Sequence, residues 1–182
     1  KAHVIALFFL YKLVDRLLIL CPKTHSAELI ERLDKFIIMD ELELIAKPDL
    51  AVLAVSGPQA LEQFPILKDL PETYQCIEQD GLVTINQSFT GEDGLLFIAD
   101  KEQWPQIDLP VLSVEDQEVL RIEAGFVDQD QDINEKTLLP ETNLQNQLVS
   151  YTKGCFVGQE IVARGKYRGS ANKSLMGLIF DD

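Results

Sequence analysis

The residue types best suited to chemistry are concentrated in residues 151 to 169, which read Y-T-K-G-C-F-V-G-Q-E-I-V-A-R-G-K-Y-R-G. Glycine enters the left-handed region of backbone space without steric cost, so the four glycines of this stretch indicate sharp turns or close approach of the backbone to another group. Cys155 lies between the first two of them, Gly154 and Gly158. The stretch therefore contains a candidate reactive thiol.

A short helix is expected directly after this cysteine. Gly158 is a suitable N-cap, residues 159 to 164 form the helix, and Gly165 ends it as the C′ residue. The two side chains expected to face inward are Ile161 and Val162. Glu160 and Arg164 are four residues apart, which is the spacing of an intrahelical ion pair.

The setting of the thiol allows two interpretations. The positive end of the expected helix and the ammonium group of Lys153 favour the thiolate form of Cys155, which is the nucleophilic form. Free cysteine is also among the most buried residue types, so a structural cysteine in a glycine-rich connection is the alternative.

A second candidate site lies at the end of a helix expected over residues 113 to 124. Ser113 and Asp116 form a start that resembles a capping box. The side chains expected to pack inward are Val119 and Ile122. Glu123 lies at the edge of this apolar stripe, where a carboxylate needs a partner because an unpaired buried charge is costly. The partner is either a ligand or a basic side chain, such as Arg121 or a neighbouring lysine.

Several blocks of the sequence carry a family resemblance. They are K-G-C-F-V-G-Q-E at 153 to 160, Y-R-G at 167 to 169, R-I-E-A-G at 121 to 125, T-L-L-P-E at 137 to 141 and V-S-G-P-Q-A at 55 to 60. Together they resemble the YgfZ-type folate-binding proteins, which are relatives of the glycine-cleavage aminomethyltransferase in the GcvT-like superfamily. The resemblance spans most of the chain, and the cysteine segment is its most specific part.

The resemblance implies a function. It implies binding of tetrahydrofolate or a one-carbon derivative, and a supporting role in iron–sulfur cluster assembly or repair through which certain tRNA modifications are affected. The implied partners are folate and iron–sulfur client or assembly proteins. No metal site of the chain itself is expected, because a lone thiolate cannot hold a cluster that generally needs four ligands.

The resemblance also suggests roles for individual residues. Glu123 matches the position that binds the pterin, whose amino group and adjacent ring N–H form a two-donor edge that fits a carboxylate. Cys155 is the expected reactive thiol, and Arg164 and Arg168 are candidates for the folate tail or for a partner's acidic surface. The further candidate cofactor contacts are Arg121, Lys153, Gly154, Gln159 and Tyr167. Cys155 and Glu123 are expected to border the same pterin-sized hollow.

The basic charge of the C-terminal part fits this interpretation without requiring it. Residues 151 to 180 carry five basic side chains against the single acid Glu160, in a chain of formal net charge −14. Such a contrast suits a local anion site, for example for the glutamyl carboxylates of a folate or for a phosphate. A solvated basic face is an equally good explanation of the charge alone.

Two other functions compete with the folate-binding accessory protein. One is aminomethyl transfer to tetrahydrofolate, to which the T-G-E-D-G turn at 90 to 94 also bears a resemblance. That reaction needs an acid or base near the reactive nitrogens of the folate, and the sequence offers no convincing candidate, so enzymatic activity is left open. The other is an interaction scaffold that has lost folate binding.

Composition limits the remaining classes. The chain has 182 residues, 46% of them hydrophobic, which suffices for a real core. Its strong negative charge argues against direct nucleic-acid binding and against anionic membranes. Three cysteines without C-x-x-C spacing indicate neither a disulfide framework nor a zinc site, and a cytoplasmic location fits best. The apolar run from Val4 to Leu20 is interrupted by charged residues and is too short for a membrane span.

The pattern along the chain predicts an α+β fold of GcvT-like type, with antiparallel sheets and helices on one face. The expected strands are residues 4 to 11, 16 to 20, 42 to 46, 51 to 56, 81 to 89 and 95 to 99, and the expected helices are 24 to 37, 57 to 64 and 113 to 124. Residues 65 to 80 are expected to be irregular. Residues 1 to 173 form the folate-binding region, apparently truncated at its N-terminus, and residues 174 to 182 form the first strand of a C-terminal barrel that is cut off.

Overall fold

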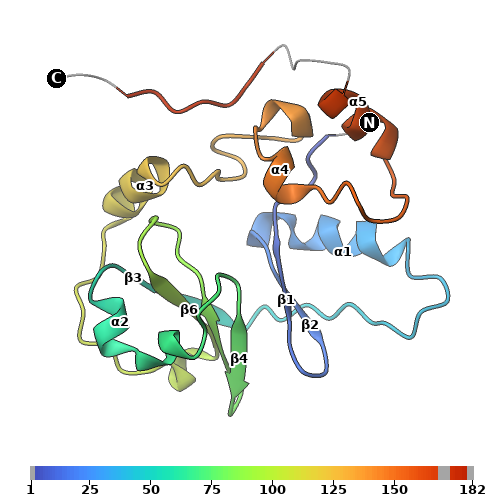
Figure 1. The fold of residues 1–182 in the computed structure, drawn as a ribbon. Helices are drawn as coiled ribbons and strands as arrows, with labels where there is room; N and C mark the ends of the chain where they lie inside the picture. Colours follow the sequence, from blue (N-terminus) through green and yellow to red (C-terminus); the bar gives the residue numbers. More distant parts are fainter. Residues whose placement is uncertain (1–2, 168–172, 180–182) are drawn as a thin grey trace. The chain divides into compact units, whose positions relative to one another are not determined.

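The computed structural model describes residues 3 to 167 and 173 to 179 and divides the chain into two compact units (Figure 1). One unit is Phe8–Phe126, and the other combines Lys1–Leu7 with Val127–Asp182. Each unit has its own packing, so each is described by itself.

The unit Phe8–Phe126 begins with a β-hairpin. Strands β1 (Phe9–Lys12) and β2 (Leu17–Leu20) pair antiparallel, with Phe9 opposite Leu20. The predicted turn and returning strand are confirmed, whereas the first strand begins at Phe9 and not at residue 4. The helical segments η1 (Lys23–His25) and α1 (Ser26–Asp34) follow, close to the predicted helix.

A four-stranded antiparallel sheet forms the centre of this unit. Its strands are β3 (Ala51–Ser56), β4 (Cys76–Gln79), β5 (Leu82–Asn86) and β6 (Gly94–Ala99), in the order β3-β6-β5-β4. All six residues of β6 are buried, since β6 has a strand on each side and covered faces above and below. The predicted α+β class with antiparallel sheets is confirmed.

Side chains of β6 alternate between the two faces of the sheet. Leu95 and Phe97 pack with residues of the 3-10 helix η2 (Pro65–Lys68) on one face, next to the short helix α2 (Ala60–Gln63) in Figure 1. Leu96 and Ile98 pack with Tyr11 and the hairpin on the other face. A sheet covered on both faces explains why these strands are almost continuously apolar.

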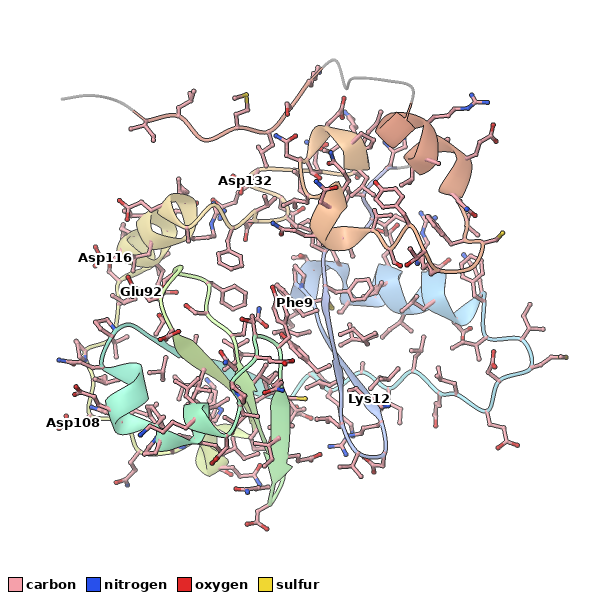
Figure 2. All side chains as sticks on the ribbon, viewed as in Figure 1. Phe9, Lys12, Glu92, Asp108, Asp116 and Asp132 are labelled. Carbon is pink, nitrogen blue, oxygen red and sulfur yellow. The ribbon has the colours of Figure 1, made fainter. Side chains whose placement is uncertain are left out.

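An aromatic cluster fastens the hairpin to its unit. The ring of Phe9, labelled in Figure 2, lies 5.8 Å from the ring of Tyr74 and 5.9 Å from that of Phe89, measured between centroids. The ring of Phe89 in turn meets Phe126 edge-on at 5.7 Å. Such tilted pairs add to the free energy of area burial by about 0.5–1.5 kcal/mol each.

Two predictions about this unit are wrong. Residues 42 to 46 form no strand, although Leu42 and Leu44 alternate with acidic residues. The alternation reports only that one side of the segment is apolar, and a strand also needs a hydrogen-bonding neighbour. Residues 65 to 80 are not irregular, because they contain η2 and the edge strand β4.

Helix α3 (Val114–Glu123) begins and ends as expected. The Ser113 hydroxyl accepts a hydrogen bond from the backbone N–H of Asp116 at 3.0 Å. Gly125 has a φ of 72°, the left-handed conformation that commonly ends a helix. The 3-10 helix η3 (Lys101–Gln103) lies between the sheet and α3 in the chain.

The second unit is built from short helices around an N-terminal segment. They are η4 (Leu139–Glu141), α4 (Gln145–Leu148) and α5 (Gln159–Tyr167). The buried Gln129 side chain accepts a hydrogen bond from the N–H of Leu7 at 2.6 Å and donates one to the carbonyl of Ile5 at 2.8 Å. One amide thus holds the N-terminal segment in the way that a neighbouring strand would.

Residues 173 to 179 adopt no strand, contrary to expectation, while Phe180 to Asp182 lie outside the described residues. The N–H of Leu175 donates to the carbonyl of Glu141 at 2.8 Å, and the Asn143 amide donates to the carbonyl of Leu175 at 2.7 Å. The predicted domain boundary after residue 173 stays a prediction. Within the described part of the chain, no helix has the length and apolar character needed to cross a membrane.

Candidate functional site

Glu123 is exposed at the C-terminal end of α3. Its carboxylate has no hydrogen bond or ion pair with any residue that the structure describes. The expected alternative, a salt bridge to Arg121, is not formed. The Arg121 guanidinium instead bonds to Glu118, three residues back, at 2.5 Å and 2.8 Å, and donates to the carbonyl of Phe126.

The face of α3 that packs inward differs from the prediction. Val119 and Ile122 are 53% and 58% exposed, so the prediction that they face the core is wrong. The half-buried side chains of α3 are Glu118, Leu120 and Arg121. Spacing shows which residues share a face of a helix, but not which face meets the rest of the protein. Glu123 therefore lies beside an exposed apolar surface of its own helix.

Cys155 is a free, exposed cysteine in the connection between α4 and α5. The interpretation as a buried structural cysteine is therefore wrong. The neighbouring Phe156 is half-buried, and the Lys153 ammonium lies 4.5 Å from the centre of its ring. A side chain added at Gly154 would meet nothing within 4 Å, so the backbone before the cysteine is open on that side.

The start of α5 is as predicted. The carbonyl of Gly158, which has a φ of 87°, accepts hydrogen bonds from the N–H groups of Ile161 and Val162 at 3.1 Å and 3.2 Å, as an N-cap residue does. Val162 is buried as expected, whereas Ile161 is 42% exposed, contrary to expectation. Gln159, the first residue of the helix, is exposed.

The side chain of Arg164 in α5 is exposed to solvent. Arg164 pairs with Glu160 at 2.5 Å, which confirms the expected i, i+4 pair, and both side chains are well exposed. Tyr167 is the last residue of α5, and Arg168 lies outside the described residues. An exposed ion pair contributes little to stability, so Arg164 can exchange its partner for another anion at low cost.

Gly165 does not end α5, because the helix continues through it. A Cβ atom at this position would lie 2.7 Å from Cγ of Pro140 in η4. The glycine therefore permits close packing of α5 on η4. The sequence pattern is ambiguous here, since glycine serves both at helix ends and at close contacts.

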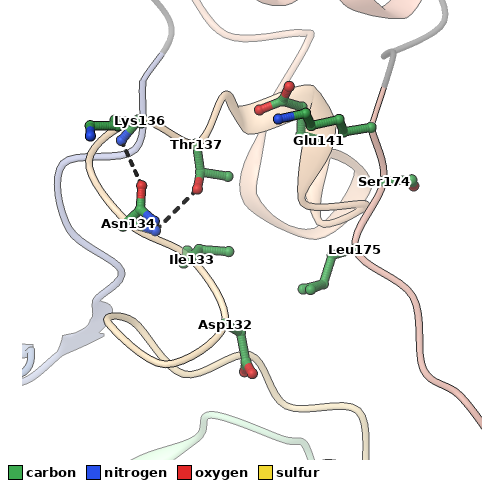
Figure 3. Close-up of a pocket in the computed structure, with 9 residues that line it drawn as sticks. Asp132, Ile133, Asn134, Lys136, Thr137, Glu141, Ser174 and Leu175 are labelled. Atoms are coloured by element: carbon green, nitrogen blue, oxygen red, sulfur yellow. Dashed lines mark hydrogen bonds between the residues drawn. The ribbon is translucent and has the colours of Figure 1, made fainter.

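A polar pocket that the sequence did not predict lies within the second unit (Figure 3). It measures about 380 Å³ and is lined by Asp132, Ile133, Asn134, Lys136, Thr137, Glu141, Lys173, Ser174 and Leu175. The Glu141 carboxylate accepts a hydrogen bond from the N–H of Leu138 at 2.8 Å, which fixes the T-L-L-P-E block at the rim.

Metal ligands are not grouped in the described part of the chain, where no three His, Cys, Asp or Glu side chains come together to hold an ion. Glu123 belongs to the unit Phe8–Phe126 and Cys155 to the other. The expectation that both border one hollow stays a prediction.

Comparison with known proteins shows which proteins the chain is similar to. It is 31% identical over 157 residues to the tRNA-modifying protein YgfZ of Yersinia enterocolitica, and 32% identical over 158 residues to that of Yersinia pseudotuberculosis. Each alignment covers 82% of this chain and 48% of the relative. The chain is therefore similar to YgfZ-type proteins over most of its own length. It spans about half the length of the curated relatives it matches.

The fold agrees with this similarity. A solved structure of the glycine cleavage system aminomethyltransferase T from Bartonella henselae matches this chain with a TM-score of 0.68. The match covers 82% of this chain and 45% of the other at 21% identity, which establishes a common fold only. No family model matches the chain.

Proposed function

We propose that this chain binds tetrahydrofolate or a one-carbon derivative, and that it supports iron–sulfur cluster assembly or repair in the cytoplasm and thereby tRNA modification. The observation that carries the proposal is the similarity to tRNA-modifying YgfZ proteins over 82% of the chain. The aminomethyltransferase shares the fold at 21% identity, so its reaction is not carried over.

Glu123 is the proposed pterin-binding residue. Its carboxylate lies at the C-terminal end of α3, where the helix dipole is negative and the last carbonyls lack intrahelical donors. A carboxylate at this position is stabilised by a ligand that donates two N–H hydrogen bonds to it, as the edge of a pterin does. The neighbouring Arg121 is engaged with Glu118, which leaves the carboxylate of Glu123 available for such a ligand.

Cys155 is the proposed reactive thiol. Its exposure allows contact with a partner protein, which a buried thiol could not make. Folate, when bound, would supply a carrier for one-carbon units, and the thiol would contact the client cluster or protein. Because one thiolate cannot complete a cluster's ligand set, that contact is shared with the partner or transient.

The test is replacement of Cys155 by Ala in a cell that lacks its own YgfZ-type protein, with a cluster-dependent tRNA modification as the readout. The proposal expects the variant to accumulate normally and to fail to restore the modification. Val157→Ala is the matched control, since Val157 is 81% exposed in the same connection. Full restoration by Cys155→Ala would remove the thiol from the mechanism, and equal loss with Val157→Ala would indicate a structural effect.

A further inference from the structure

The four-stranded sheet has β3 at one edge and β4 at the other, and the two edges differ in charge (Figure 1). Strand β4 contains Glu78, which forms an ion pair with Arg16 at 2.6 Å. Charged side chains, prolines and bulges on an edge strand keep it from pairing with another chain. Strand β3 has none of these, since its sequence is A-V-L-A-V-S and its register with β6 is continuous. The β3 edge is therefore suited to accept a further strand.

The hydrogen bonds between β3 and β6 show which backbone groups lie along this edge. The N–H of Gly57 donates to the carbonyl of Asp93, and only alternate residues of an antiparallel pair exchange such bonds. The odd-numbered residues of β3 therefore bond to β6, and the N–H and C=O groups of Val52, Ala54 and Ser56 point away from it. These outward groups have no hydrogen-bond partner in the part of the chain that the structure describes.

The distribution of charge favours a second copy of the chain at this edge. The formal net charge of −14 opposes contact between most surfaces of two copies. Residues 50 to 61, which contain β3, form the longest stretch of the sequence without a charged residue. Val52 and Ala54 are exposed, so this uncharged stretch reaches the surface. Two copies can therefore meet at β3 without bringing like charges together.

The β3 edge is also complementary to itself. With a two-fold axis at Ala54, that residue pairs with the partner's Ala54, and Val52 pairs with the partner's Ser56, so that every outward N–H meets an outward C=O. A shift of two residues in one direction would place Val52 opposite Pro58, which has no N–H. A shift in the other direction would place Ser56 opposite Leu50, whose N–H is already bonded within the turn before β3. The pairing about Ala54 therefore satisfies the most backbone groups.

We propose that the β3 edge is a homodimer interface, in which the β3 strands of two copies pair antiparallel about a two-fold axis at Ala54. The two sheets become one continuous sheet, and the assembly closes at two copies because each copy uses its β3 edge in the contact. On one face of the joined sheet, Leu53 lies beside the partner's Val55, and these apolar side chains cover each other. The inference is independent of folate binding.

The test measures the mass of the unmodified chain by sedimentation equilibrium from about 10 μM to about 1 mM, without folate. The salt concentration is about 0.15 M, at which repulsion between exposed charges is screened beyond about 8 Å. The proposal expects the mass to rise with concentration from that of one chain toward that of two. A mass of one chain over the whole range, or growth beyond two chains, overturns it.

Hydrogen exchange of single amides, followed by nuclear magnetic resonance, locates the contact. The amides of Val52, Ala54 and Ser56 should exchange at least about tenfold more slowly at the high concentration than at the low one, because strand pairing protects them. The amides of Leu53 and Val55, which bond to β6, should already be protected at the low concentration. A dimer that leaves the exchange of the three outward amides unchanged contradicts the proposed interface.

Two variants at one position should keep the chain monomeric. Ala54→Lys brings two like charges together at the two-fold axis, and Ala54→Pro removes an outward N–H that the bonds to β6 do not use. Circular dichroism checks that each variant is folded. Val14→Lys is the matched control, since Val14 is fully exposed in the hairpin turn of the same unit, and it should dimerise like the unmodified chain. Dimers in both Ala54 variants, or a monomeric control, overturn the proposal.

Discussion

At the scale of single residues, Tyr11 and Gln87 form a buried polar pair in the core. Both side chains are 2% exposed, and the Tyr11 hydroxyl donates to the Gln87 side-chain oxygen. The amide nitrogen of Gln87 has no partner among the described residues. The pair joins the β1–β2 hairpin to the residue after β5, so it also fixes the position of the hairpin on the sheet.

Replacing Tyr11 by Phe should lower the free energy of unfolding by about 1–3 kcal/mol, because the buried oxygen of Gln87 then loses its donor. Urea unfolding followed by circular dichroism measures the change. The double variant Tyr11→Phe/Gln87→Leu should recover most of the loss, since replacing both partners by apolar groups removes the unsatisfied atoms. A double variant less stable than Tyr11→Phe would show that the hydrogen bond is not the cause.

The same tyrosine predicts a loss of stability in alkali. Burial, as the main cause, raises the pKa of Tyr11 well above the ordinary value, which is about 10. Above that pH the unfolded chain releases the proton of Tyr11 while the folded chain keeps it. The unfolded state then binds fewer protons, so the free energy of unfolding falls as pH rises, by up to about 1.4 kcal/mol per pH unit.

Urea unfolding measured between pH 9 and pH 11 tests whether the free energy of unfolding falls as the pH rises. The Tyr11→Phe variant should lack this part of the slope. Tyr74→Phe, at a 50% exposed tyrosine, should keep most of it, because burial is the main cause of the raised pKa of Tyr11 and the charge of Tyr74 adds less. A slope that persists unchanged in Tyr11→Phe would assign the alkaline transition to other groups.

At the scale of elements, the contact between α5 and η4 decides how the cysteine segment is held. Gly165→Ala places a methyl group 2.7 Å from Cγ of Pro140, and we expect a loss of about 1–3 kcal/mol from overpacking. Without that contact, alanine would stabilise the helix by about 0.5–1 kcal/mol. The sign of the change in urea unfolding therefore reports the contact.

Two companion variants separate the causes. Gly165→Ala combined with Pro140→Ala should restore stability, since the colliding ring is then removed. Gly154→Ala, at a position with open space, should change the free energy of unfolding by less than about 0.5 kcal/mol. A stabilising effect of Gly165→Ala alone would contradict the packing of α5 on η4.

Elements with local signals were predicted well from the sequence, and those that depend on distant partners were not. Ala51–Ser56 was predicted in full, and the β5 and β6 hairpin followed from apolar runs around a glycine-containing turn. The prediction of a strand at residues 42 to 46 was wrong, because alternating apolar and acidic residues do not ensure that a neighbouring strand is present to accept and donate hydrogen bonds. The prediction of which face of α3 points inward was wrong, because the periodicity of apolar residues does not identify what a helix packs against.

The candidate site was predicted in part. The N-cap Gly158, the Glu160–Arg164 pair and the end of α3 at Gly125 all follow from short-range spacing, and the structure confirms them. The partner of Arg121 and the polar pocket near Glu141 depend on contacts between loops, which leave no periodic trace in the sequence.

At the scale of the whole molecule, the chain has a GcvT-like fold, similarity to YgfZ-type relatives and an exposed carboxylate at the end of α3. The relatives give the similarity to YgfZ-type proteins, and the structure leaves Glu123 exposed at the end of α3. Folate binding is the claim that connects these observations to a function, and Glu123 is the residue on which it depends.

The most direct measurement is thermal unfolding of the chain with and without tetrahydrofolate, repeated for Glu123→Gln and for Glu115→Gln, an exposed acid at the start of the same helix. At a ligand concentration of about 100 times the dissociation constant, the account predicts a gain of about 2.7 kcal/mol in the free energy of unfolding. Glu115→Gln should show the same gain, and Glu123→Gln should lose most of it at the same ligand concentration. No gain in the unmodified chain, or an undiminished gain in Glu123→Gln, would contradict the account.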